Sequence, residues 1–204
     1  MRGDTIPTRS SEFGHRLSTL LQQFVWVALL KGRPQDLPSG VNPFQAALGV
    51  NIFTYVIAVA SVRSIPSSIM LALVDVAVTG LCLFIAVSLV DKRVRFYQAG
   101  TALFGGTAVI NLAAIPVLWL SSLTGQTAIG LLDVMIILWG LAIISHVLRH
   151  TLEVNPWISV GLAVAFYIIV LQLLVITGVI GAGPENDQQL SIYQTLSPFW
   201  LSKA

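Results

Sequence analysis

The chain has 204 residues, of which 55% are hydrophobic and only 10% are charged, and its mean hydropathy is +0.84. Soluble domains usually carry about 25% charged residues, so this chain has too little charge to cover a water-facing surface of its size. The 11 basic and 9 acidic residues nearly balance, which gives no reason to expect a nucleic-acid partner, and the single Cys82 excludes an internal disulfide or a cysteine-rich metal site. The composition predicts a small protein with several membrane spans.

Residues 1–40 are expected to form a cytoplasmic segment that precedes the spans. Its apolar residues recur at helical spacing and its basic residues fall mostly elsewhere, which predicts a helix lying in the headgroup region of the bilayer. The alternative is a sixth, short span, although the apolar stretch Val25–Leu30 is too short to cross. A proline-bounded linker, Arg33–Gly40, leads into the first span. The apolar face is Phe13, Leu17, Leu20, Leu21, Phe24 and Ala28, and the candidates for lipid-headgroup contacts are Arg9, Arg16, Lys31 and Arg33.

Five later segments are long and apolar enough to cross the hydrocarbon core, which takes about 20 residues of helix. Each break between them contains charge, proline or glycine, and the long apolar runs lack the alternation of barrel strands. We therefore expect an all-α integral membrane protein with a five-helix transmembrane domain over residues 41–181 and a polar extracytoplasmic tail over residues 182–204. The expected spans are Phe44–Val62, Ser67–Val90, Ala99–Ser121, Gln126–Leu148 and Trp157–Gly181.

The basic residues beside the spans are distributed unequally. Nine lie in residues 1–40 and in the second and fourth loops, whereas two lie on the opposite side of the membrane. Because Lys and Arg concentrate in cytoplasmic loops, the N-terminus is expected in the cytoplasm and the C-terminus outside. The second loop adds further candidates for lipid-headgroup contacts, which are Lys92, Arg93 and Arg95.

Two acidic residues, Asp75 and Asp133, fall inside the expected spans, each about 12 Å from the extracytoplasmic start of its helix. A carboxylate at the centre of a span costs about 2.5–3.5 kcal/mol, so each acid needs a partner, water or a proton. One hypothesis is a carboxylate pair that binds a cation or shares a proton. The other is that each acid hydrogen-bonds a neighbouring helix and fixes its register, with Asn111 and Gln172 as candidate partners.

Small residues and a proline mark the third and fourth spans. Pro116 removes a backbone donor, which predicts a kink near Leu112. The small residues favour close packing between helices, with a hinge in the third span as the alternative. The candidate packing or hinge residues are Gly105, Gly106, Pro116, Gly130 and Gly140.

His146, His150 and Glu153 follow one another at offsets of four and seven, which places them on one helical face at the cytoplasmic end of the fourth span. Two imidazoles and a carboxylate suit a divalent metal, but a lipid-headgroup or partner contact assisted by Arg149 explains the same residues. The sequence contains no serine–histidine–acid motif, phosphate-binding glycine loop or zinc-protease motif. We therefore expect no enzymatic activity, no metal and no other cofactor.

Two stretches carry a resemblance to a known family. The basic loop Arg93–Gln98 enters a glycine- and proline-bearing span that reaches Pro116, and Trp139–Ala142 lies in the fourth span. With these features the chain, over about Val41–Gly181, resembles the Yip-type family of five-pass membrane proteins (Ypt/Rab-interacting proteins and their bacterial relatives). The resemblance implies a cytoplasmic N-terminus, five spans and a non-enzymatic role in membrane organisation or partner assembly. The N-terminal segment is too short for an elaborate GTPase-docking domain, and the family implies no catalytic residues.

The expected function is a structural, assembly or membrane-organising role in a bacterial cytoplasmic (inner) membrane, including that of a subunit in a larger complex. The expected partners are the lipid bilayer and other membrane protein subunits or further copies of the chain. The alternative is a small transporter or permease that uses Asp75 and Asp133 for proton or cation coupling. A third hypothesis is a lipid-binding scaffold that uses the basic residues of the N-terminal segment.

Overall fold

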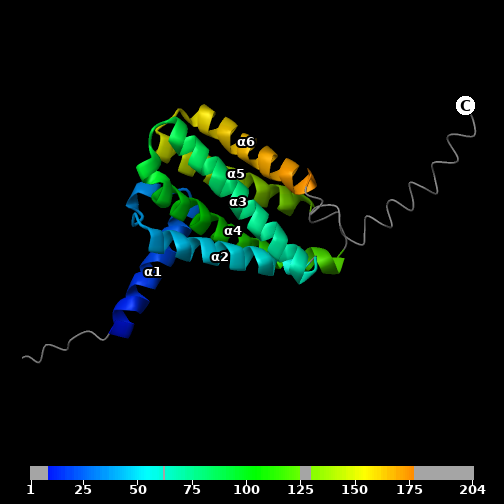
Figure 1. Cartoon of the computed structure of the whole chain (residues 1–204). Coiled ribbons are helices and arrows are strands. Elements are labelled where there is room, and N and C mark those ends of the chain that lie inside the picture. The colour runs from blue at the N-terminus through cyan, green and yellow to red at the C-terminus, as the bar shows by residue number, and fades with distance from the viewer. Residues whose placement is uncertain (1–8, 62, 125–129, 177–204) are drawn as a thin grey trace, which may run out of the picture.

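The computed structural model describes residues 9–61, 63–124 and 130–176 (Figure 1). Every regular element in these residues is a helix, and five of the helices are long and apolar enough to cross a membrane. The prediction of an all-α, multi-pass membrane protein with five spans is confirmed. The elements are α1 (Arg9–Ala28), η1 (Pro34–Asp36), α2 (Val41–Ala60), α3 (Ile65–Leu89), η2 (Arg93–Arg95), α4 (Phe96–Thr124), α5 (Gly130–Leu152) and α6 (Pro156–Ile176).

The helix boundaries follow from local chemistry. Pro66 and Pro156 stand in the first turns of α3 and α6, where a missing N–H costs nothing. α3 and α5 end before Asp91 and Glu153, whose φ angles of 56° and 58° are left-handed, as is common at the ends of helices. The predicted start of the fourth span, the predicted end of the fifth and the C-terminal tail over 182–204 lie outside the described residues.

Among the five spans, α4 is central: it contacts α2, α3 and α5 and also α1, while α6 lies against α5 and α3 (Figure 1). α1 crosses the direction of the spans at one end of the bundle. We call this the α1 end; it holds the first residues of α2, α4 and α6 and the last residues of α3 and α5. α1 is not among the five candidate spans, so the expectation of five rather than six is confirmed.

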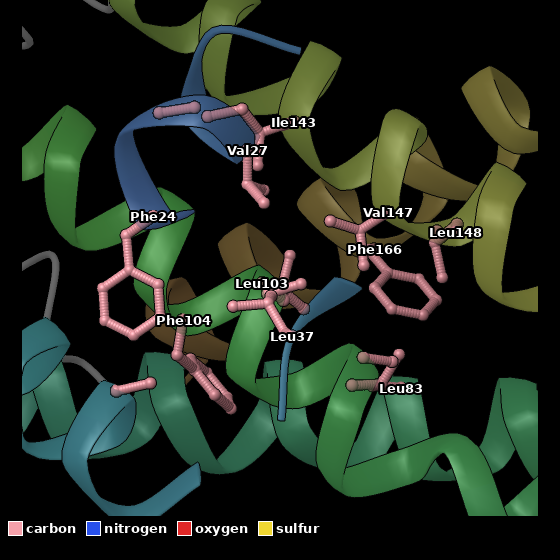
Figure 2. Close-up of a cluster of buried hydrophobic side chains, with 14 of the residues drawn as sticks. Phe24, Val27, Leu37, Leu83, Leu103, Phe104, Ile143, Val147, Leu148 and Phe166 are labelled. Atoms are coloured by element: carbon pink, nitrogen blue, oxygen red, sulfur yellow. The ribbon is translucent and has the colours of Figure 1, made fainter. Parts of the chain in front are cut away.

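The hydrophobic core lies toward the α1 end and includes side chains of α1 itself (Figure 2). Phe24 and Val27 of α1 and Leu37 of the linker are at most 4% exposed. α1 and the linker are therefore packed into the same core as the spans. The buried core residues from the spans include Leu83, Val87, Leu103, Phe104, Ile143, Val147, Leu148 and Phe166.

A buried polar contact joins α2 to α4. Asn51, only 2% exposed, accepts hydrogen bonds through Oδ1 from Thr107 Oγ1 at 3.0 Å and from Asn111 Nδ2 at 3.1 Å. Such interhelical bonds contribute on average about 0.6 kcal/mol in a membrane protein. Asn111 was expected to be a partner for an intramembrane acid; instead it fixes the register of α2 against α4.

Candidate functional site

α1 is seated on two glycines of α4. A Cβ atom on Gly105 would overlap the ring of Phe24, and one on Gly106 would lie 3.2 Å from Val27 Cγ1 and 3.1 Å from Ile143 Cγ2. Only a residue without a side chain lets α1 approach this closely. The close packing predicted for this glycine pair is confirmed, although the element that packs on it is α1, which was expected to lie apart from the spans.

The residues that follow Phe24 are held by hydrogen bonds to their backbone carbonyls. Trp139 Nε1 of α5 donates to the Ala28 carbonyl at 2.7 Å, and His146 Nε2 lies 2.9 Å from the Gly32 carbonyl oxygen. Gln98 Nε2 of α4 donates to two further linker carbonyls, each at 2.8 Å. The last carbonyls of a helix have no partner within it, so these side chains satisfy groups that burial would otherwise penalise. We call residues 24–37 the cap.

The chain reverses at the end of α1 in a tight turn. Leu30 has a φ of 60°, and the N–H groups of Lys31 and Gly32 both donate to the Trp26 carbonyl at 2.9 Å. A branched side chain rarely adopts this conformation, which is held here by the contacts on either side of it. The turn directs the linker back across the ends of α4 and α5.

α1 also has an apolar face that the bundle does not cover. Leu21, Val25 and Trp26 of α1, with Leu29 directly after its end, are 43–52% exposed. The single apolar face expected from the sequence is therefore divided: Phe24 and Ala28 enter the core and Leu21 faces outward. The side chains of Phe13 and Leu17, like those of Arg9 and Arg16, lie outside the described residues.

Glu153 binds two basic residues of the loop between α3 and α4. Its carboxylate lies 2.6 Å from Lys92 Nζ and 2.5 Å from Arg95 Nη1. Lys92 also donates to the Leu152 carbonyl at 3.2 Å, so the loop closes the end of α5. Hydrogen bonds from Lys92 and then Arg95, together with their charge, lower the pKa of Glu153 from 4.5 to about 2.

The same contacts explain why the suggested metal site is wrong. Because α5 ends at Leu152 and Glu153 has a left-handed φ, the carboxylate turns to the loop rather than to the histidines. His146 binds the Gly32 carbonyl, and its ring centroid is 4.6 Å from that of His150. Within the described part of the chain, no three His, Cys, Asp or Glu residues group as metal ligands.

We expect Glu153→Gln to change how stability depends on pH. Because the pKa is depressed in the folded state, the ionised carboxylate contributes stability above pH 4.5, and this contribution is lost as the pH falls toward about 2. In detergent, the wild-type protein should therefore unfold at a higher temperature than Glu153→Gln at about pH 7, and the difference between the two unfolding temperatures should be smaller at about pH 3. Because the ion pairs are exposed, added salt should screen them and reduce the difference in unfolding temperature between the two proteins at neutral pH. An equal difference at both pH values would contradict the prediction.

Of the two intramembrane acids, the structure describes the side chain of Asp75. Asp75 is half-buried on α3, which packs mainly on α2 and α6 and touches α5 only slightly. Asp75 and Arg63 both act electrostatically on Tyr55 of α2, as does Tyr167 of α6. The side chain of Asp133 lies outside the described residues. Gln172, a proposed partner, is exposed on α6.

The remaining packing candidates differ from Gly105 and Gly106. Within the described part of the chain, a Cβ on Gly140 would meet no atom within 4 Å, so the close packing predicted there is not found in these residues. Pro116 is exposed inside α4, which continues from Phe96 to Thr124. The side-chain environment of Gly130 lies outside the described residues.

Three polar residues that hold the structure together were missed as site residues in the sequence. Asn51 stood unremarked within the first span, and Gln98 and Trp139 were noted only for the family resemblance. The only feature of the sequence that could have indicated the role of Gln98 is its position as a polar residue at the end of a span. Its partners could not be predicted, because the two carbonyls that it bonds lie 61 and 63 residues away in the chain.

The fold and the cap define an all-α, multi-pass membrane protein whose N-terminal helix is docked across one end of its spans. No family model, curated protein or solved structure matches the chain.

Proposed function

We propose that the protein is a non-enzymatic structural or assembly protein of the bacterial cytoplasmic membrane that holds an apolar helix at the membrane surface for contact with other subunits or further copies of the chain. The observation that carries the proposal is the division of α1. Phe24 and Val27 fix the helix on α4, while Leu21, Val25 and Trp26 remain uncovered. A rigidly mounted apolar face suits docking, because little flexibility is lost on binding.

The proposed orientation places the α1 end in the cytoplasm and the C-terminus outside. It rests on the basic residues near the α1 end, which include Lys31, Arg33 and Arg149. A helix that crosses the direction of the spans and exposes Trp26 fits the headgroup region, where tryptophan concentrates.

Membership of the Yip-type family forms part of the same proposal. Both stretches that carry the resemblance contribute to the cap: Gln98 holds the linker and Trp139 holds the end of α1. The role that the resemblance implies, membrane organisation or partner assembly, agrees with a bundle built around a docked surface helix.

The experiment is purification of the protein from its native membrane in a mild detergent, followed by mass measurement and identification of co-purifying chains. We expect a defined complex with wild type and with Gly140→Ala. We expect its yield to fall severalfold with Gly105→Ala, because the added Cβ displaces α1 while the one at Gly140 meets nothing. A monomeric wild-type protein, or a complex that is indifferent to Gly105→Ala, would contradict the proposal.

The second candidate is a proton- or cation-coupled permease that uses Asp75 and Asp133. The position of Asp75 within the span α3 favours it, because a charge inside the membrane is costly unless it has a use or a partner. Proton flux into reconstituted vesicles would then be present in wild type and Asp91→Asn, whose acid is in an exposed loop, and absent in Asp75→Asn. The assembly proposal expects no flux in any of the three.

A further inference from the structure

The basic residues at the α1 end fall into two groups. Lys92 and Arg95 both form salt bridges with Glu153. Within the described residues, neither Arg33 nor Arg149 forms a salt bridge, and both are exposed. Asp36, the acid closest in sequence to Arg33, accepts a hydrogen bond from the backbone N–H of Arg33 at 3.3 Å.

The cap brings these two arginines to the same place. His146 binds the carbonyl of Gly32, and Gln35 Nε2 donates to the carbonyl of His150 at 3.3 Å, so Arg33 is held beside the last turn of α5. Arg33 and Arg149 both act electrostatically on the His150 ring. The linker at Arg33 therefore lies beside the last turn of α5, which carries Arg149 and His150, although the two segments are more than 100 residues apart in the chain.

Favourable interaction with the helix dipole accounts for only part of this arrangement. Basic residues in the last turn of a helix interact favourably with its carbonyl end, which explains Arg149 and His150. It does not explain Arg33, which belongs to the linker. Guanidinium groups bind phosphate oxygens through paired N–H donors, and an imidazole adds a further donor.

We propose that Arg33, Arg149 and His150 bind the phosphate group of an anionic phospholipid. The site stands at the end of a span, at the depth where lipid phosphates lie. Beside it, Leu29 and Leu30 are 49% and 40% exposed and offer an apolar surface for the acyl chains. This neighbouring surface favours a lipid over free phosphate. The inference does not depend on the assembly role, because it requires only that the chain spans a membrane.

The test is native mass spectrometry of the detergent-purified protein titrated with phosphatidylglycerol or with phosphatidylcholine. We expect phosphatidylglycerol to bind at least severalfold more tightly. Arg33→Gln and Arg149→Gln should each weaken it by about two- to fivefold, the range for exposed ion pairs. Arg93→Gln is the matched control, because it removes an equally exposed charge from the other loop and should change binding by less than about twofold.

Three results would overturn the proposal. Equal weakening by Arg93→Gln would show general attraction between charges rather than a site. Equal binding of phosphatidylcholine would remove the requirement for an anionic lipid. Displacement of phosphatidylglycerol by millimolar inorganic phosphate would identify free phosphate as the ligand. Circular dichroism of each variant should match wild type, since the altered side chains are exposed.

Discussion

Gly105→Ala is expected to unfold about 1–3 kcal/mol more easily than Gly140→Ala, the usual cost of overpacking a well-filled core. Both changes replace a glycine inside a spanning helix and share the same gain in helix propensity. They differ in what the new Cβ meets: the ring of Phe24 at Gly105, and no atom within 4 Å at Gly140. The difference between the two variants therefore reports the docking of α1.

Titration with sodium dodecyl sulfate in mixed micelles, followed by circular dichroism, would give the two free energies of unfolding. Limited digestion with trypsin provides a local readout, because Lys31 lies in the cap and should be cleaved faster once α1 is displaced. Equal stability and equal cleavage of the two variants would show that α1 does not rest on Gly105.

Trp139→Phe is expected to lower the free energy of unfolding by about 1–3 kcal/mol, the cost of leaving a buried polar group without its hydrogen bond. Phenylalanine retains most of the apolar surface but removes Nε1, which donates to the Ala28 carbonyl at 2.7 Å. Ala28 is 1% exposed, so water has little access to replace the lost bond.

Trp157→Phe is the matched control for that change. Trp157 is 83% exposed at the start of α6, so its replacement should leave stability nearly unchanged. Unfolding titrations of both variants, monitored by circular dichroism rather than by tryptophan fluorescence, provide the comparison. If Trp139→Phe were as stable as Trp157→Phe, the bond to Ala28 would not help to hold the cap.

The spans were predictable because each is a long apolar run interrupted by charge, proline or glycine, which are local properties. The starts of α3 and α6 are within two residues of prediction, since Pro66 and Pro156 mark them. The sequence also identified Gly105 as a packing residue. It gave no sign of what would pack there, because Phe24 is 81 residues away and an amphipathic helix suits the lipid surface as well as a protein groove.

The site residues were harder to predict because their partners are distant in the chain or are backbone atoms. Glu153 would share a helical face with the two histidines of α5 only if the helix continued past Leu152. The left-handed φ of Glu153 ends the helix there, so its carboxylate leaves that face. Asn111 was expected to bond an intramembrane acid, but it donates a hydrogen bond to Asn51 on α2. Gly140 shows that a small residue in a span does not by itself imply a close helix contact.

Hydrogen–deuterium exchange of the protein in lipid nanodiscs tests the docking of the cap most directly. The amides of Lys31 and Gly32 are bonded to Trp26, and that of Leu37 is bonded to Pro34, inside a linker that would otherwise be open to water. We predict that residues 24–37 exchange more slowly than residues 18–22 by at least about tenfold, and that Gly105→Ala abolishes the difference. Equal and rapid exchange over both stretches in the wild-type protein would contradict a docked α1.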